Sequence, residues 1–254
     1  MGHEEMLAGR LPFELHTTGE DAVLCLHGFT GSPGIYRKLT KQLHAAGFAV
    51  SAPLLPGHGT QPTDMVQITV DDWLQAAETA YSTLKARYSK VHLVGLSLGG
   101  ALACALAADH PELHSLVLLA PAFAVNPWIT QRLGLSEPQP AADSDRIVPL
   151  PTRQPDGGEM DECIFGYNGF PVAAMLQLRQ AGQLARQCCS AVHTPTCVIY
   201  TAADRVVDPA ACEQMAQTIP GLQQLIRLPK SEHNILLGCD RLQAGQQILQ
   251  FLCR

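Results

Sequence analysis

The stretch "KVHLVGLSLGGALAC", residues 90–104, places one serine between an apolar run and a helical pattern. The run that ends at Leu96 is nearly unbroken by polar residues, which predicts a strand buried on both faces. Because the helical pattern begins directly after Ser97, this serine must occupy a sharp turn from strand to helix. Gly95 and Gly99 lie two residues on either side, where glycine leaves room at a tight bend. The spacing is the GxSxG pattern of a nucleophile elbow, with Ser97 as the predicted nucleophile.

Apolar strand-like runs and helical patterns alternate along most of the chain. Besides the strand before Ser97, we expect strands at residues 22–28, 47–55, 115–121, 196–202 and 222–229. Helical spacing is seen at residues 34–46, 70–88, 99–110, 209–219 and 240–252. This order predicts an α/β fold with a doubly wound, mostly parallel sheet, in which ligands bind beyond the carboxyl ends of the strands.

The alternation fails once, in the segment 122–191. Its first half is rich in Pro, Asp and Gly, and its second half, residues 170–189, has helical spacing with an apolar face. A structureless loop of that length would be unusual in a compact domain. We therefore predict that residues 122–191 form an inserted cap over the strand ends, and that residues 1–121 and 192–254 form the core.

A cap in this position would shape the substrate pocket. Its large apolar side chains are Phe123, Trp128, Leu133, Phe165, Phe170, Met175, Leu176 and Leu178. Such side chains can bury the methylenes of an acyl chain. Trp128, Met175 and Leu178 are the cap residues that we expect to bind substrate, together with Phe29 of the core. The alternative is that the cap side chains only pack against the core.

A serine hydroxyl is a weak nucleophile at neutral pH, so it needs a base to take its proton and an acid to orient that base. In folds with this elbow the chain order is serine, then acid, then histidine. His233, in "PKSEHNILLG", is the only histidine that follows a suitable acid, and Asp204 is the first polar side chain after its strand. Asp208 precedes Pro209 and a helix, so a helix N-cap explains it. We therefore predict Ser97, Asp204 and His233 as the catalytic residues.

Attack by a serine hydroxyl on a carbonyl group also needs hydrogen-bond donors for the oxyanion of the tetrahedral intermediate. In this fold one donor is the backbone N–H of the residue after the nucleophile, here Leu98. The other comes from the loop after an early strand, which is the glycine-rich "LHGFTGSPG" of residues 26–34. We predict the N–H of Phe29 as this second donor.

Composition narrows the classes of partner. The 254 residues carry a net charge of −6 without any block of lysine or arginine, which argues against nucleic acid and anionic membranes as partners. The beginning, "MGHEEMLAGRLPFEL", lacks the apolar segment of a secretion signal, so we expect a cytoplasmic protein without stable membrane association. Nine cysteines without a CxxC pair are typical of reduced thiols, and no metal site is expected.

Five motifs in one order resemble a known family. They are "LHGFTG", "PGHGTQPTDM", "GLSLGG", "AADRVVDP" and "SEHNILL", spread over residues 26–237. Together they resemble the bacterial carboxylesterases and monoacylglycerol lipases of the α/β-hydrolase superfamily. The resemblance implies the α/β-hydrolase fold and hydrolysis of carboxylic esters through an acyl-enzyme, with no metal or organic cofactor. Carried over by position, it assigns the nucleophile, acid, base and oxyanion amides to the residues chosen above.

The expected function is a serine hydrolase that cleaves carboxylic esters of short to medium acyl chains, that is, a carboxylesterase. A monoacylglycerol lipase, a thioesterase, a carbon-carbon bond hydrolase or an acyltransferase could use the same residues, because fold and catalytic residues do not determine the substrate. An alternative of a different class is a ligand receptor of the same fold with little turnover, against which the intact Ser, Asp and His argue. The physiological ester and the oligomeric state stay open.

Overall fold

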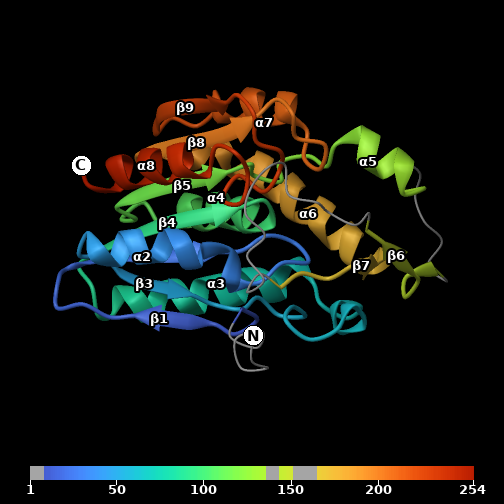
Figure 1. Cartoon of the computed structure of the whole chain (residues 1–254), viewed down its shortest axis with the longest axis horizontal. Coiled ribbons are helices and arrows are strands. Elements are labelled where there is room, and N and C mark those ends of the chain that lie inside the picture. Colours follow the sequence, from blue (N-terminus) through green and yellow to red (C-terminus); the bar gives the residue numbers. More distant parts are fainter. Residues whose placement is uncertain (1–8, 136–142, 151–164) are drawn as a thin grey trace.

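A seven-stranded sheet runs through the centre of the protein in a computed structural model that describes residues 9–135, 143–150 and 165–254 (Figure 1). The strand order is β1-β3-β2-β4-β5-β8-β9. The strands are β1 (Phe13–Leu15), β2 (Asp21–Leu26), β3 (Ala49–Ala52), β4 (Lys90–Leu96), β5 (Ser115–Leu119), β8 (Thr196–Thr201) and β9 (Leu222–Leu228). Every neighbouring pair is parallel except β1 and β3, which run antiparallel. The predicted α/β class with a mostly parallel sheet is confirmed.

Helices cover both faces of this sheet, as a doubly wound fold requires (Figure 1). The helices outside the predicted cap are α2 (Arg37–Ala45), α3 (Val70–Lys85), α4 (Leu98–Asp109), α7 (Pro209–Ala216) and α8 (Arg241–Leu252), with short 3-10 turns η1 (Pro33–Tyr36) and η2 (Pro62–Met65). A third 3-10 turn, η4 (Cys189–Ala191), ends the predicted cap segment. Helices α2 and α8 contact each other on one face, and α3 and α4 contact each other on the other. Within the described ranges, no helix combines the length and the apolar character needed to cross a membrane.

Helix α4 lies at the centre of its layer. Every residue from Leu98 to Ala107 is buried, because the sheet covers one side of the helix while α3 and α6 (Val172–Cys188) cover the others. A helix that is apolar on all sides is stable only in such a position. The helix that follows Ser97 is therefore held firmly against the sheet.

The described part of the predicted cap contains more regular structure than its sequence suggests. Before the helix α6 it includes the short helix α5 (Pro127–Arg132) and a two-stranded antiparallel ladder of β6 (Ile147–Pro149) and β7 (Gly169–Pro171). The sequence predicts loop around β6, since a three-residue strand is too short to show a period of two. Helix α6 packs on α4, and its Gly182 lies so close to the chain at Ala122 and Phe123 that a Cβ there would overlap two carbonyl oxygens.

The turn from β4 to α4 is the tightest point of the fold. Ser97 has a φ of 55° and a ψ of −114°, in a region that residues other than glycine rarely adopt. A Cβ on Gly95 would overlap the carbonyl oxygen of Gly99, and a Cβ on Gly99 would overlap that of Leu26, the last residue of β2. The prediction that these glycines leave room at the bend agrees with this geometry.

We expect Gly99→Ala to lower the free energy of unfolding by at least about 2 kcal/mol, because the added methyl group meets backbone atoms that cannot move aside. Gly245→Ala on α8 is the matched control. Its Cβ would lie 3.1 Å from the mobile end of the Gln42 side chain, and alanine is the better helix former, so stability should stay equal or rise by up to about 1 kcal/mol. Urea unfolding of both variants measures the difference, and equal losses would contradict the close approach at Gly99.

Candidate active site

Backbone hydrogen bonds on both sides hold Ser97 in its strained conformation. Its N–H donates to the carbonyl of Leu119 on β5 at 2.9 Å, and its own carbonyl accepts from the N–H of Ala122 at 2.9 Å and of Ala101 at 3.0 Å. These partners come from two neighbouring segments, so the turn cannot relax without breaking sheet and helix contacts. Ser97 stands at the carboxyl end of β4, with 5% of its surface exposed.

Asp204 and His233 lie at the same edge of the sheet, after β8 and β9. The Nδ1 of His233 is 2.7 Å from Oδ2 of Asp204. The second carboxylate oxygen, Oδ1, accepts the N–H groups of Val206 at 2.8 Å and Val207 at 2.9 Å. Because the carboxylate is acceptor-only when ionised, the proton of the imidazole sits on Nδ1, and Nε2 is left as an acceptor. Both side chains are nearly buried, so this orientation is well defined.

Asp208 has the structural role that the sequence predicts for it. It is the N-cap of α7, where its Oδ1 accepts the N–H of Ala210 at 3.0 Å, with Pro209 in the first turn. A cap of this kind satisfies a helix N–H that has no partner within the helix. The two aspartates of "AADRVVDP" therefore make different contacts.

Two polar residues that the sequence analysis does not identify hold the loops of the site in place. Asn126 donates from Nδ2 to the carbonyl of Asp204 at 3.1 Å, while its Oδ1 caps α5. Asp240 accepts the N–H groups of Lys230 at 2.8 Å and Ser231 at 2.7 Å, on the segment that leads to His233. Although burial raises the pKa of Asp240, these hydrogen bonds hold it below the usual value. Asn126 stands before a proline, an N-cap signal, but nothing local indicates its second contact.

The glycine-rich loop after β2 lies against the nucleophile. A Cβ on Gly28 would be 3.2 Å from the Cβ of Ser97, so the peptide group between Gly28 and Phe29 lies close to this serine. The Phe29 N–H makes no hydrogen bond with any residue that the structure describes. Leu98 is the first residue of α4, where the helix leaves the N–H without an internal partner. Two backbone donors thus flank the turn at Ser97.

Three aromatic rings lie around the Phe29 side chain. The Phe29 ring lies 5.3 Å from the ring of Phe170 on β7, 6.3 Å from that of Trp73 and 6.4 Å from that of His58, measured between centroids. The contact with Phe170 joins the segment 122–191 to the loop after β2. An apolar surface of this kind can pack against the acyl part of a substrate.

The three cap residues predicted to bind substrate differ in exposure. Met175 and Leu178 on α6 are buried with 5% of their surface exposed, which packing of α6 on the core explains by itself. Trp128 on α5 is 44% exposed, and the guanidinium groups of Arg132 and Arg205 lie 5.4 Å and 5.5 Å from its ring centroid. Arg205 follows Asp204 in sequence, so Trp128 lies near the loop that carries Asp204.

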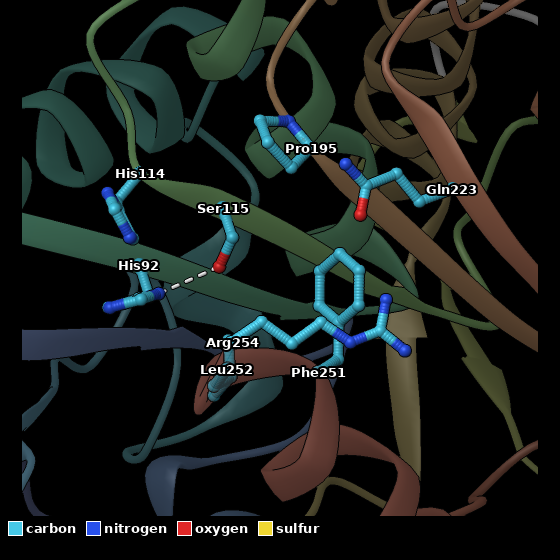
Figure 2. A pocket seen from close by; sticks show the side chains of 8 residues that line it. All are labelled: His92, His114, Ser115, Pro195, Gln223, Phe251, Leu252 and Arg254. Carbon is cyan, nitrogen blue, oxygen red and sulfur yellow. Dashed lines mark hydrogen bonds between the residues drawn. The ribbon is translucent and has the colours of Figure 1, made fainter.

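A hydrogen-bonded chain of aspartate, histidine and serine occurs at the opposite edge of the sheet. The His92 ring is 2.7 Å from Ser115 Oγ through Nδ1 and 3.1 Å from Asp21 Oδ1 through Nε2. A cavity of about 170 Å³ lies beside it. Figure 2 shows the side chains that line it, which are His92, His114, Ser115, Pro195, Gln223, Phe251, Leu252 and Arg254. Burial is the main cause that lowers the pKa of His92.

Backbone pairing argues against catalysis at this second serine. Ser115 is the first residue of β5, and the adjacent N–H groups of His114 and Leu116 donate to the carbonyls of Val91 and Pro195. Neither of these two amides is therefore left to stabilise an oxyanion there. Among the described residues, moreover, no group of three or more His, Cys, Asp or Glu is arranged to hold a metal ion. The edge that carries Ser97 is the better candidate.

Comparisons with known proteins agree with this fold. Residues 18–240 match the family model described as Hydrolase_4, serine aminopeptidase, S33. The chain is 30% identical over 250 residues to a thermostable monoacylglycerol lipase of Bacillus sp. (strain H-257), covering 98% of this chain and 96% of that protein. It is 25% identical over 236 residues to a carboxylesterase of Bacillus subtilis (strain 168), covering 92% of this chain and 93% of the relative.

Solved structures share the arrangement of the sheet and helices. A structure from work on LipS and LipT, two metagenome-derived lipolytic enzymes, aligns with a TM-score of 0.82 and 29% identity over 96% of this chain and 98% of that chain. A monoacylglycerol lipase of Paleococcus ferrophilus has the same fold, with a TM-score of 0.74 and 18% identity over 95% of this chain and 97% of that chain. The parallel sheet, the elbow at Ser97 and a family match from residue 18 to residue 240 lead to one conclusion: the chain belongs to the Hydrolase_4 family, described as serine aminopeptidase S33, within the α/β-hydrolases.

Proposed function

We propose that the protein is a serine hydrolase that cleaves carboxylic esters of short to medium acyl chains through an acyl-enzyme. The observation that carries this proposal is the hydrogen bond of 2.7 Å between His233 and Asp204, at the sheet edge where Ser97 stands on a strained turn. An oriented imidazole with a free Nε2 is what activation of a serine hydroxyl requires.

In the first half of the reaction, Oγ of Ser97 attacks the carbonyl carbon of the ester while Nε2 of His233 takes the hydroxyl proton. Asp204 stabilises the imidazolium that forms, and the N–H groups of Phe29 and Leu98 hydrogen-bond the oxyanion. The tetrahedral intermediate collapses, and His233 returns the proton to the departing alcohol. Water then repeats these steps on the acyl-enzyme, releasing the carboxylic acid and restoring the Ser97 hydroxyl.

The names of the relatives support esters as the substrate class. The two relatives described above are a monoacylglycerol lipase and a carboxylesterase, although the family description names an aminopeptidase. A monoacylglycerol lipase is the second candidate, favoured by the relative that is 30% identical over 98% of this chain. Hydrolysis of p-nitrophenyl butyrate, 1-monolauroylglycerol and an aminoacyl p-nitroanilide under the same conditions compares the three classes. Turnover of the anilide alone would overturn the ester assignment.

The segment 122–191 acts in this proposal as a cap that lines the acyl pocket. The ring contact between Phe170 and Phe29 at 5.3 Å supports a position next to the oxyanion loop. Trp128, beside the acid loop, would form part of the pocket entrance, and Met175 and Leu178 would form its inner wall. Each acyl methylene buried there contributes about 0.8 kcal/mol until the pocket is full.

We expect Ser97→Ala to lower kcat for p-nitrophenyl butyrate by roughly 10⁴-fold or more, and His233→Ala to be comparably inactive, because these residues act as a unit. Far-ultraviolet circular dichroism and the melting temperature serve as controls for folding. A folded Ser97→Ala protein that keeps more than about a tenth of the wild-type kcat would refute the assignment of the nucleophile.

The two aspartates of one loop provide a matched pair. Asp204→Asn should lower kcat by orders of magnitude, up to about 10⁴-fold, because an amide cannot hold the imidazole in the required tautomer. Asp208→Asn should keep most of the activity, because asparagine caps a helix about as well as aspartate. Steady-state kinetics of both variants shows which aspartate orients the imidazole. The reverse order of effects would identify Asp208 as the acid.

We expect kcat/KM to peak between butyrate and about decanoate in a series of p-nitrophenyl esters, because each added methylene contributes about 0.8 kcal/mol only while the pocket has room. Met175→Ala and Leu178→Ala should shift this optimum if the side chains line the pocket, and should only lower the melting temperature if they pack the core. A steady rise to palmitate, or rapid hydrolysis of emulsified triolein, would favour a lipase instead.

A further inference from the structure

Two buried histidines, His27 and His58, are neither the nucleophile, the acid nor the base of the proposed reaction. Their exposed fractions are 0% and 2%, and their rings meet edge to face with centroids 5.0 Å apart. Burial lowers the pKa of His27 to about 3 and that of His58 to about 4. Both rings are therefore neutral near pH 7, and each has one nitrogen that donates and one that accepts.

His27 controls the peptide group that carries the oxyanion donor. Its Nε2 accepts the N–H of Leu55 at 3.0 Å, so its proton is on Nδ1, which donates to the carbonyl of Gly28 at 3.0 Å. This carbonyl and the N–H of Phe29 belong to one trans peptide unit, in which the two groups point in opposite directions. Holding the Gly28 carbonyl therefore sets the direction of the Phe29 N–H. The N–H of Gly31, at 3.1 Å, is the second donor to the same carbonyl.

His58 holds the next peptide group in the same way. Its Nδ1 donates to the carbonyl of Pro56 at 3.0 Å, and its Nε2 accepts the N–H of Thr30 at 3.2 Å. Thr30 has a φ of 61°, a strained value for a β-branched residue, so it needs partners that keep it there. Its carbonyl accepts the N–H of Tyr167 at 2.8 Å. The peptide groups on both sides of Phe29 are thus anchored by histidine rings.

We propose that His27 and His58 are positioning residues for the oxyanion hole, which fix the two peptide groups flanking Phe29 so that its N–H meets the oxyanion formed at Ser97. The inference rests on the proposed function, because it assigns a role within that reaction. Both rings also bridge the oxyanion loop to the segment 55–58, which makes this segment a rigid support of the site.

A donor that serves only the tetrahedral state affects kcat more than KM, since the ground-state ester does not use it fully. Loss of one oxyanion donor costs about 10²- to 10³-fold in kcat, and a misplacement of about 1 Å costs about 10²-fold. A histidine that served only packing would instead lower the melting temperature without changing kcat for each folded molecule.

The two nitrogens of His27 can be tested separately. In His27→Asn the amide nitrogen can take the place of Nδ1 and donate to Gly28, whereas in His27→Gln the amide oxygen can take the place of Nε2 and accept from Leu55. We expect kcat for p-nitrophenyl butyrate to fall by about 50-fold in His27→Gln and by less than about 5-fold in His27→Asn, with KM within about 3-fold. Equal kcat values in the two variants would overturn the role of His27.

His58 provides a second, independent pair. His58→Gln keeps an acceptor for the Thr30 N–H and should rescue most of the kcat that His58→Leu loses, about 10-fold or more. If the His27 variants do not fold, the His58 variants still test the positioning role. The matched control is His92→Gln, which removes an equally buried histidine at the opposite edge of the sheet and should lower only the melting temperature.

Inhibition by an alkyl trifluoromethyl ketone, which forms a tetrahedral adduct, gives a readout that does not depend on turnover. Its affinity should fall in parallel with kcat in His27→Gln and His58→Leu, and an unchanged affinity would overturn the proposal. The wild type and Ser97→Ala are measured alongside. If Ser97→Ala keeps the wild-type rate, the proposed function fails, whereas equal kcat in the paired histidine variants of an active enzyme refutes the positioning role alone.

Discussion

The close approach of α4 to the ends of β4 and β2 is the constraint on which the rest of the site depends. Gly99 lies where a Cβ would overlap the carbonyl of Leu26, so the first turn of α4 touches the last residue of β2. The loop that leaves β2 must then begin directly beside Ser97. One glycine thus brings together two segments separated by about 70 positions, and the positive φ of Ser97 is a consequence of the same crowding.

Around this turn, polar side chains hold the loops in place, because these loops lie beyond the sheet and lack its backbone hydrogen bonds. Asn126 holds the loop at Asp204, Asp240 holds the segment before His233, and His27 and His58 hold the loop at Phe29. Most of the bonds run from a side chain to a backbone group of a neighbouring segment, and their burial makes each one costly to lose. Ser97 can therefore keep its strained backbone conformation without the neighbouring loops relaxing.

The sequence predicts the sheet well because buried parallel strands are unbroken apolar runs, as in residues 91–96 and 196–201. It selects Asp204 and His233 from chain order, and the structure joins these side chains by a hydrogen bond, while their catalytic roles stay a prediction. It does not indicate β1, with three residues and an antiparallel partner, or the short ladder of β6 and β7. Hydrogen bonds such as that from the N–H of Tyr167 to the carbonyl of Thr30 join segments far apart in the sequence, so no local sequence pattern predicts them.

In the described part of the protein, Asp204 and His233 form a hydrogen-bonded pair at the edge that carries Ser97, and Asp21, His92 and Ser115 form a hydrogen-bonded chain at the opposite edge. Comparison of the two serines indicates which features favour nucleophilic attack. Both serines are nearly buried, and each stands at one end of a central strand. Ser115 begins its strand, and the amides on either side of it are hydrogen-bonded to the neighbouring strand segments. Ser97 instead follows its strand and precedes a helix, whose first N–H groups have no partner within the helix. Hydrogen bonds between side chains can arise wherever buried polar groups need partners. A serine becomes a competent nucleophile where the backbone also leaves donors for the charge that its attack creates.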